Sequence, residues 1–173
     1  MASGTLSIDS LVNAPRVLLA PLPTFVLQPA LRRIALKLFR GRPELGERLG
    51  EHRCKHFLID PLNLPFVFVL RPDPDDPLLR AVRRGREPAH DARIAGTFLS
   101  LLDMVDGRLD GDALFFSRAL QVTGDTEAVV SLRNALDDAE GSLADDVAAL
   151  HGPPGRLVLQ RLRAMRTRGT RGV

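Results

Sequence analysis

The sequence predicts an α+β domain in which helices lie against a single β-sheet, and two observations lead to this fold class. Short apolar runs rich in Phe, Val and Ile have the length and composition of strands, and Pro, Gly or Asp bounds each run. Other segments carry apolar residues at spacings of three and four, as amphipathic helices do. The expected order is a helix, three strands, a helix, two strands, a helix and a tail.

The length of 173 residues and the apolar fraction of 45% fit one domain with tails. Residues 1–23 combine small, polar and proline residues without a regular period, and they predict a flexible lead-in. Prolines interrupt the apolar stretch from Val17 to Leu31, which is too short to cross a bilayer. The domain is expected over residues 24–152, followed by an arginine-rich tail over residues 153–173.

The first helix is expected from Thr24, as its N-cap, to Arg40. Its apolar stripe contains Leu27, Leu31, Ile34 and Leu38. Pro29 is tolerated only in the first turn, so the regular part starts after Thr24. Four basic residues project away from the stripe: Arg32, Arg33, Lys37 and Arg40. A second short helix is expected from Pro43 to His52.

Two strands are expected from Lys55 to Asp60 and from Leu64 to Arg71, and their continuous apolarity predicts that both of their faces are at least partly covered. Residues 71–88 contain four prolines and are expected to form a loop, with one helical turn around residues 77–84. A third strand is expected from Asp91 to Thr97, followed by a helix from Phe98 to Val105.

A strand pair is expected over residues 112–117 and 119–124, and Asp125 then stands where a helix cap belongs. The helix that follows has Val129, Leu132 and Leu136 on one side. Residues 142–150 and 156–166 are expected to form two further helices.

The positive charge is concentrated at one end of the chain. Residues 1–155 hold 18 basic and 21 acidic residues, a balance of −3, whereas the last eighteen residues add six arginines and no acid. The chain has no Trp or Tyr, and all eight Phe precede Ser117, so the tail has no aromatic platform for stacking bases. Nucleic acid is therefore not an expected partner. The single cysteine, Cys54, excludes an intrachain disulfide and favours a cytoplasmic protein.

One stretch resembles a known family. The residues that carry the resemblance are Ala113, Leu114, Phe115, Phe116, Leu120, Val122, Gly124, Asp125, Leu132 and Asn134. They resemble the C-terminal half of the sterol carrier protein type-two (SCP-2) lipid-binding domain, and the order of elements agrees. Within that superfamily, residues 110–138 are most similar to the bacterial ubiquinone biosynthesis accessory factor T.

The resemblance implies a five-stranded sheet covered by helices, with an apolar cavity between them for a lipid or isoprenoid. It implies a noncatalytic accessory protein without cofactor, which assists oxygen-independent ubiquinone biosynthesis alongside partner hydroxylases by holding a quinone precursor or a phospholipid. The expected wall residues are Phe57, Phe66, Phe68, Ile94, Phe98, Leu102, Phe115 and Leu120. Each phenylalanine taken alone is also the residue type that fills a core, and periodicity does not separate the two roles.

The basic residues Arg32, Arg33, Lys37 and Arg40 predict contact with an anionic membrane surface, where a ligand confined to the bilayer must be collected. A solvated helix face is the simpler explanation of the same charges. Two other functions remain open: a protein-interaction module that docks biosynthetic enzymes through this helix, and an RNA-associated protein that acts through the arginine tail.

Two clusters of chemically capable residues are assigned to structure. His52, Cys54 and His56 would point the same way on an extended segment, but three ligands on one strand rarely complete a zinc tetrahedron, so no metal is expected. Asp112 and Asp125 lie near strand ends without an accompanying His, Ser or Lys arrangement. No enzymatic activity is expected from these residues.

Overall fold

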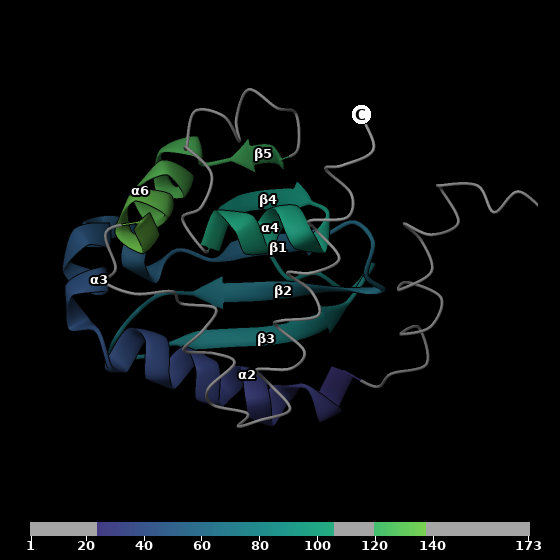
Figure 1. Ribbon diagram of the computed structural model, residues 1–173, viewed down its shortest axis with the longest axis horizontal. Helices are drawn as coiled ribbons and strands as arrows, with labels where there is room; N and C mark the ends of the chain where they lie inside the picture. Colours follow the sequence, from purple (N-terminus) through teal and green to yellow (C-terminus); the bar gives the residue numbers. More distant parts are fainter. Residues whose placement is uncertain (1–23, 106–119, 138–173) are drawn as a thin grey trace, which may run out of the picture.

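A five-stranded sheet organises residues 24–105 and 120–137, the parts of the chain that the computed structural model describes (Figure 1). The strands lie in the order β3-β2-β1-β4-β5; β1 and β4 are parallel, and the other neighbouring strands are antiparallel. Their bounds are β1 Phe57–Pro61, β2 Phe66–Arg71, β3 Leu78–Arg83, β4 Ala92–Gly96 and β5 Leu120–Gly124. The predicted α+β fold with one five-stranded sheet is confirmed.

The helices flank this sheet. In Figure 1, α2 runs beside β3 at one edge, and α6 lies near β4 and β5 at the other edge. The helical segments are η1 Thr24–Val26, α2 Gln28–Ala35, the π-helical η2 Leu36–Arg40, α3 Pro43–Leu49, the 3-10 helix η3 Gly50–Cys54, α4 Phe98–Val105 and α6 Thr126–Asp137. The expected helices before the sheet, after β4 and after β5 are therefore present.

The start of the first helical segment differs from the prediction. Thr24 is not the N-cap of α2: that position is held by Leu27, and no side chain caps the helix. Thr24 instead begins a 3-10 turn, in which the Leu27 N–H donates to the Thr24 carbonyl oxygen at 3.1 Å. Pro29 lies in the first turn of α2, as expected, where the missing N–H would have no helical partner in any case.

The cap of α6 is confirmed. The Ala128 N–H donates to Oδ1 of Asp125 at 2.9 Å and thus satisfies one of the free amides of the first turn.

The prediction of a loop with a helical turn at residues 77–84 is wrong, because this segment is the edge strand β3. It pairs with β2 in continuous antiparallel register, from Leu78 opposite Arg71 to Arg83 opposite Phe66. The four prolines of residues 71–88 all lie outside the strand, so none removes an N–H from the ladder. Of the other expected elements, the strand at 112–117 and the helices at 142–150 and 156–166 fall outside the described residues, as do the lead-in and the tail.

Both faces of the central strands carry buried apolar side chains. The described helices pack on one face, which we call the helix-covered face. On the reverse face Leu58, Val67 and Val69 are buried and pack against Leu78 and Val82. The expectation that both faces of β1 and β2 are covered is confirmed for these residues.

Candidate functional site

The helix-covered face collects apolar side chains from all five strands. Because side chains alternate along a strand, Phe57 and Ile59 of β1 point to the same face, and the register places Phe68 of β2 beside Ile59. Ile94 of β4 pairs with Ile59 from the other side and with Val122 of β5. The face therefore presents one continuous apolar surface to the helices.

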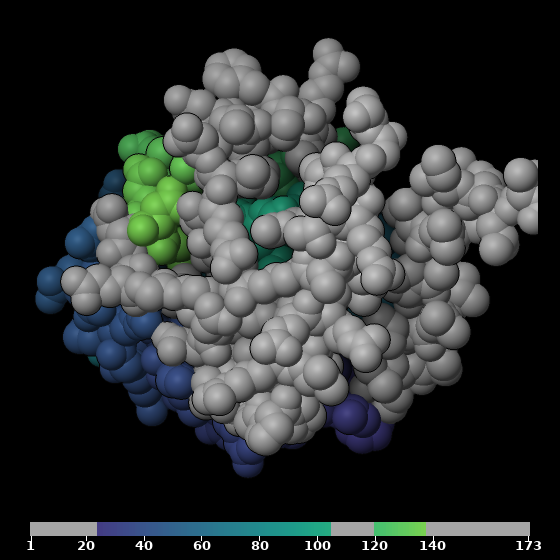
Figure 2. All heavy atoms as spheres, in the orientation of Figure 1, coloured from purple at the N-terminus to yellow at the C-terminus, as the bar shows by residue number. Residues whose placement is uncertain are grey.

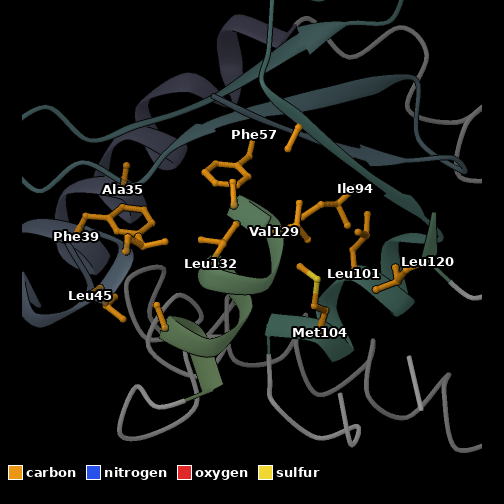
Figure 3. Close-up of a cluster of buried hydrophobic side chains, with 14 residues drawn as sticks. Ala35, Phe39, Leu45, Phe57, Ile94, Leu101, Met104, Leu120, Val129 and Leu132 are labelled. Atoms are coloured by element: carbon orange, nitrogen blue, oxygen red, sulfur yellow. The ribbon is translucent and has the colours of Figure 1, made fainter. Parts of the chain in front are cut away.

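Most of this surface is filled by a main core, shown in Figure 3. Helices α3, α4 and α6 supply Leu45, Met104 and Leu132 to this core. Its buried members are Ala35, Phe39, Leu45, Leu49, Phe57, Ala92, Ile94, Leu101, Met104, Leu120, Ala128, Val129, Leu132 and Ala135. Phe57 and Ile94 are fully buried, which is the property of residues that stabilise the domain.

A second group, which we call the aromatic cluster, lies where α2 begins. Its buried members are Leu64, Phe66 and Ala81, and Leu27, Leu31, Phe68 and Phe98 pack against it. The rings of Phe66 and Phe68 meet edge to face, with centroids 5.5 Å apart and an interplanar angle of 78°. Gln28 fixes α2 to the sheet here, because its Nε2 donates to the Ala81 carbonyl oxygen at 2.7 Å.

On the helix-covered face of β1, β2 and β3, four apolar side chains are only half-buried: Ile59, Phe68, Leu70 and Leu79. We call them the apolar floor. The register makes them neighbours, since Ile59 lies opposite Phe68 and Leu70 lies opposite Leu79. Half-buried helix residues pack against the same two clusters as the floor residues, namely Leu38 against the main core and Leu31 and Phe98 against the aromatic cluster. An apolar molecule laid on this surface would remove it from water.

The expected wall residues fall into different places. Phe57, Ile94 and Leu120 belong to the main core, whereas Phe66, Phe68 and Phe98 belong to the aromatic cluster. Leu102 is half-buried on α4, and Phe115 falls outside the described residues. Sequence reasoning missed Ile59, Leu70 and Leu79. Ile59 and Leu70 lie within two of the predicted strands, so the alternation of side chains along these strands could have identified them. Leu79 was missed because residues 71–88 were predicted to form a loop.

The reverse face holds a buried charge. The side chain of Asp60 is 3% exposed, and two guanidinium groups bind it: Arg84 Nη2 lies 2.7 Å from Oδ1, and Arg93 Nη2 lies 2.5 Å from Oδ2. Burial raises the pKa of the Asp60 carboxyl, but the hydrogen bonds and positive charges of Arg84 and Arg93 outweigh burial and lower it below its ordinary value of 3.8. Asp60 therefore stays ionised and ties β1 to β4 and to the segment after β3.

The expected basic face exists. Arg32, Arg33, Lys37 and Arg40 are exposed, while Ile34 and Phe39 on the opposite side of the same helical segment are buried. No helix within residues 24–105 and 120–137 is long and apolar enough to cross a membrane.

The histidine and cysteine pattern has a different geometry from the expected one. His52 and Cys54 lie in the 3-10 helix η3 rather than on an extended segment, so alternation does not bring them to one side with His56. Among the residues that the structure describes, no group of three or more His, Cys, Asp or Glu side chains could hold a metal ion. Cys54 is exposed, and its Sγ lies 3.4 Å from Oδ2 of Asp73.

The sequence matches one known protein family. The model of the SCP-2 sterol transfer family matches residues 36–137. No curated protein matches the sequence. Among solved structures, the chain is similar to a "UbiJ-SCP2 Ubiquinone synthesis protein" with 19% identity and a TM-score of 0.48, over 68% of this chain and 90% of that one.

Two further solved structures are similar to this chain. Sterol Carrier Protein 2 from Yarrowia lipolytica, in its apo form, is 13% identical with a TM-score of 0.46, over 68% of this chain and 92% of that one. The sterol carrier protein domain 2 of Helicoverpa armigera is 15% identical with a TM-score of 0.44, over 65% and 92% of the two chains.

Proposed function

The chain belongs to the SCP-2 sterol transfer family, and from this premise we propose that it is a noncatalytic carrier that holds an apolar lipid on the apolar floor, between α2 and α4. The observation that carries the proposal is the contrast in burial on one face of the sheet. Phe57 and Ile94 are fully buried, whereas Ile59, Phe68, Leu70 and Leu79 keep accessible surface among other apolar side chains. Covering such surface contributes about 25 cal/mol per Å².

The chemistry of the floor fits binding without reaction. Its side chains are hydrocarbon, so they hold a ligand through shape and the hydrophobic effect alone. The buried carboxylate of Asp60 is on the reverse face and is held by two arginines. Asp125 is occupied by Lys55 and by the α6 amide of Ala128. These acids therefore serve the architecture in this proposal, and none acts on the ligand.

For the ligand we propose an isoprenoid quinone precursor, which the protein presents to the hydroxylases of ubiquinone biosynthesis. Support comes from the sequence resemblance of residues 110–138 to accessory factor T. A polyprenyl tail and the acyl chain of a phospholipid are both long and apolar, although only the polyprenyl tail is branched. Either could lie along the floor. The two ligands differ in their head groups, which mass spectrometry distinguishes.

The direct test is to purify the protein without detergent, extract it with organic solvent and identify the lipids by mass spectrometry. We expect a polyprenyl phenol or related quinone precursor at substoichiometric to stoichiometric amounts. Phospholipid alone would support the carrier and refute the quinone assignment. An empty extract, together with no uptake of fluorescent prenyl and fatty-acid probes by a folded sample, would refute the carrier itself.

A pair of variants assigns the binding surface. Leu79→Trp enlarges a half-buried side chain of the floor, so we expect it to reduce probe uptake by about tenfold or more through loss of space. Val130→Trp is the matched control, because Val130 is 46% exposed on α6 and outside the floor. Equal uptake by both variants, with similar melting temperatures, would place the ligand elsewhere.

The basic face supports a peripheral position at the inner membrane. We propose that Arg32, Arg33, Lys37 and Arg40 attract anionic headgroups, each with about 1 kcal/mol near the surface. Changing all four to Glu should weaken association with anionic vesicles and leave binding of hydroxylase partners intact. Lost partner binding with vesicle association intact would favour the protein-interaction module instead.

A further inference from the structure

The large exposed apolar residues are unevenly placed. Within residues 24–105 and 120–137 they are Phe25 at 72% exposed, Val26 at 53%, Val130 at 46% and Leu62 at 42%. Phe25 and Val26 belong to η1, and Leu62 lies in the turn between β1 and β2. Only Val130, on α6, lies away from that end of the domain.

Hydrogen bonds bring η1 and the β1–β2 turn to the same end of the sheet. Phe66, at the start of β2, lies opposite Arg83, at the end of β3. Arg84, the next residue, donates from Nη2 to the carbonyl oxygens of Pro61 and Leu64 at 3.1 and 3.2 Å, so the turn carrying Leu62 is fixed beside the end of β3.

The first turn of α2 is fixed to the same place. Gln28 is bound to the carbonyl oxygen of Ala81, and Leu27 packs with Leu64 and Phe66 in the aromatic cluster. The residues directly before Leu27 therefore lie at this end, and η1 packs against β3. Figure 2 shows the start of the described chain, in purple, reaching the surface at the lower right.

Positive charge accompanies these apolar side chains. Arg83 and Arg86 are exposed around the turn at Gly85, whose φ of 86° reverses the chain after β3. The nearby carboxylates are engaged: Asp60 holds Arg84 and Arg93, and Glu87 accepts a hydrogen bond from the Gly85 N–H at 2.8 Å. The end of the domain thus combines protruding apolar groups with exposed arginines.

We propose that this end is a membrane-docking surface, in which Phe25, Val26 and Leu62 enter the interface of an anionic bilayer while Arg83 and Arg86 bind lipid phosphates. Exposed apolar groups on separate turns, rimmed by cations, suit a fluid interface that adapts to their shape, and arginine stems can extend to the headgroups. This docking deepens the proposed carrier function and rests on it. It also adds an orientation, end-on to the bilayer, that the basic face of α2 does not define.

The side chains behind the docking surface explain why an end-on orientation would suit a lipid carrier. Leu27 follows the exposed Val26 directly and packs in the aromatic cluster, which includes Phe68 of the floor. Apolar side chains therefore continue from the docking surface to the proposed ligand site. A lipid leaving the bilayer at this end would meet hydrocarbon rather than charge along that path.

The experiment uses the full chain and vesicles of phosphatidylcholine with or without phosphatidylglycerol. Because the sequence contains no Trp, Phe25→Trp introduces a single fluorophore. We expect its emission to shift to the blue with phosphatidylglycerol vesicles and to be quenched by brominated lipid chains. The control Val130→Trp should show neither effect. Emission from position 25 that vesicles leave unchanged, or equal responses at both positions, would overturn end-on docking.

Binding measurements give an independent check. The triple change of Phe25, Val26 and Leu62 to Ser should weaken vesicle binding by about tenfold or more, while Val130→Ser leaves it unchanged. Arg83→Glu with Arg86→Glu should weaken binding to phosphatidylglycerol vesicles and not to pure phosphatidylcholine. Unaltered binding in both variants, with loss only when the α2 charges are changed, would overturn the proposal.

Lipid uptake from a dispersion without vesicles separates this proposal from the carrier function. Uptake retained by the triple Ser variant, with vesicle binding lost, supports docking and carriage as distinct properties. A wild-type protein that binds vesicles through position 25 but extracts and takes up no lipid would refute the carrier and leave the docking surface standing.

Discussion

Lys55 and Asp125, seventy positions apart, form an ion pair with 2.5 Å between Nζ and Oδ2. The same ammonium group lies 2.8 Å from Nδ1 of His52, which must accept, because lysine has no acceptor. Asp125 in turn caps α6. One cation therefore joins η3, the residues before β1 and the first turn of the helix that covers the main core.

Removal of this cation should loosen α6. Lys55→Met keeps the apolar stem and deletes the charge, so we expect a lower melting temperature at pH 7 and faster amide exchange in the first turn of α6. Arg133→Met removes an i,i+4 pair with Asp137 on the same helix and serves as the control. If amide exchange in the first turn of α6 is the same in the Lys55 variant as in the wild type, the pair does not hold this helix.

The contribution of the Lys55–Asp125 ion pair to stability should depend on pH in both the acidic and the alkaline range. The hydrogen bond with Asp125 raises the pKa of Lys55 above 10.5, and the hydrogen bond from Lys55 lowers the pKa of Asp125 below 3.8. A raised lysine pKa gives stability that is complete below pH 10.5 and is lost as pH rises through the folded-state pKa. A lowered aspartate pKa gives stability that is present above pH 3.8 and is lost as pH falls. Thermal melts of wild type and Lys55→Met should differ most between these limits and converge outside them.

Asp60 should account for part of the acid sensitivity of the domain. Its folded-state pKa lies below 3.8, so its stabilisation is present above that pH and disappears as pH falls through the lowered value. Asp60→Asn leaves Arg84 and Arg93 without a carboxylate, and we expect it to cost about 2 to 3 kcal/mol at pH 7 because these arginines are partly exposed. Urea unfolding at pH 3 and pH 7 checks this: the loss between the two pH values should be smaller in the variant than in the wild type.

Phe57 and Phe68 should separate stability from ligand binding. Phe57 is fully buried in the main core, so Phe57→Ala should cost about 3 to 5 kcal/mol of unfolding free energy. Phe68 is half-buried on the floor, and Phe68→Ala should cost about 1 to 2 kcal/mol. If the protein carries a lipid on the floor, Phe68→Ala should alter the affinity of the folded protein for the probe, and Phe57→Ala should not. Denaturant melts and probe titrations on the same samples provide both numbers, and a Phe68 variant with wild-type affinity would exclude its ring from the site.

The sequence was sufficient for those elements whose signals are local. Alternation at residues 91–97 and 119–124, helical spacing at residues 24–40 and the cap at Asp125 all depend on near neighbours. The structure confirms the cap, the strands at Ala92–Gly96 and Leu120–Gly124, and a helix at Gln28–Ala35 that continues as the π-helical η2. β3 was missed because its signal is not local. Leu78 to Arg83 contains two arginines and follows several prolines, and it becomes a strand through pairing with the whole of β2.

The site was harder to predict than the fold for the same reason. A phenylalanine in a core and one on a binding surface have the same spacing, and only the helices above the sheet decide which of them is fully covered. Phe57 lies among α3 and α6 residues, whereas Phe68 lies where the aromatic cluster meets the floor. The membrane-docking surface depends on η1, the turn between β1 and β2, and the turn at Gly85. These three segments are distant in the sequence and come together only when the sheet forms.

Gly124, at the junction of β5 and α6, should tolerate substitution less well than Gly85. Its φ is 83°, and a Cβ there would lie 2.3 Å from the Asp91 carbonyl oxygen, which accepts the Asp125 N–H at 2.9 Å. Gly85 has a similar φ of 86°, but a Cβ there would meet nothing within 4 Å. Gly85→Ala should therefore cost about 1 kcal/mol from backbone conformation alone, and Gly124→Ala about 2 kcal/mol or more, because β4 and β5 must also separate. Equal losses of unfolding free energy in urea would show that β4 and β5 accommodate a Cβ at position 124.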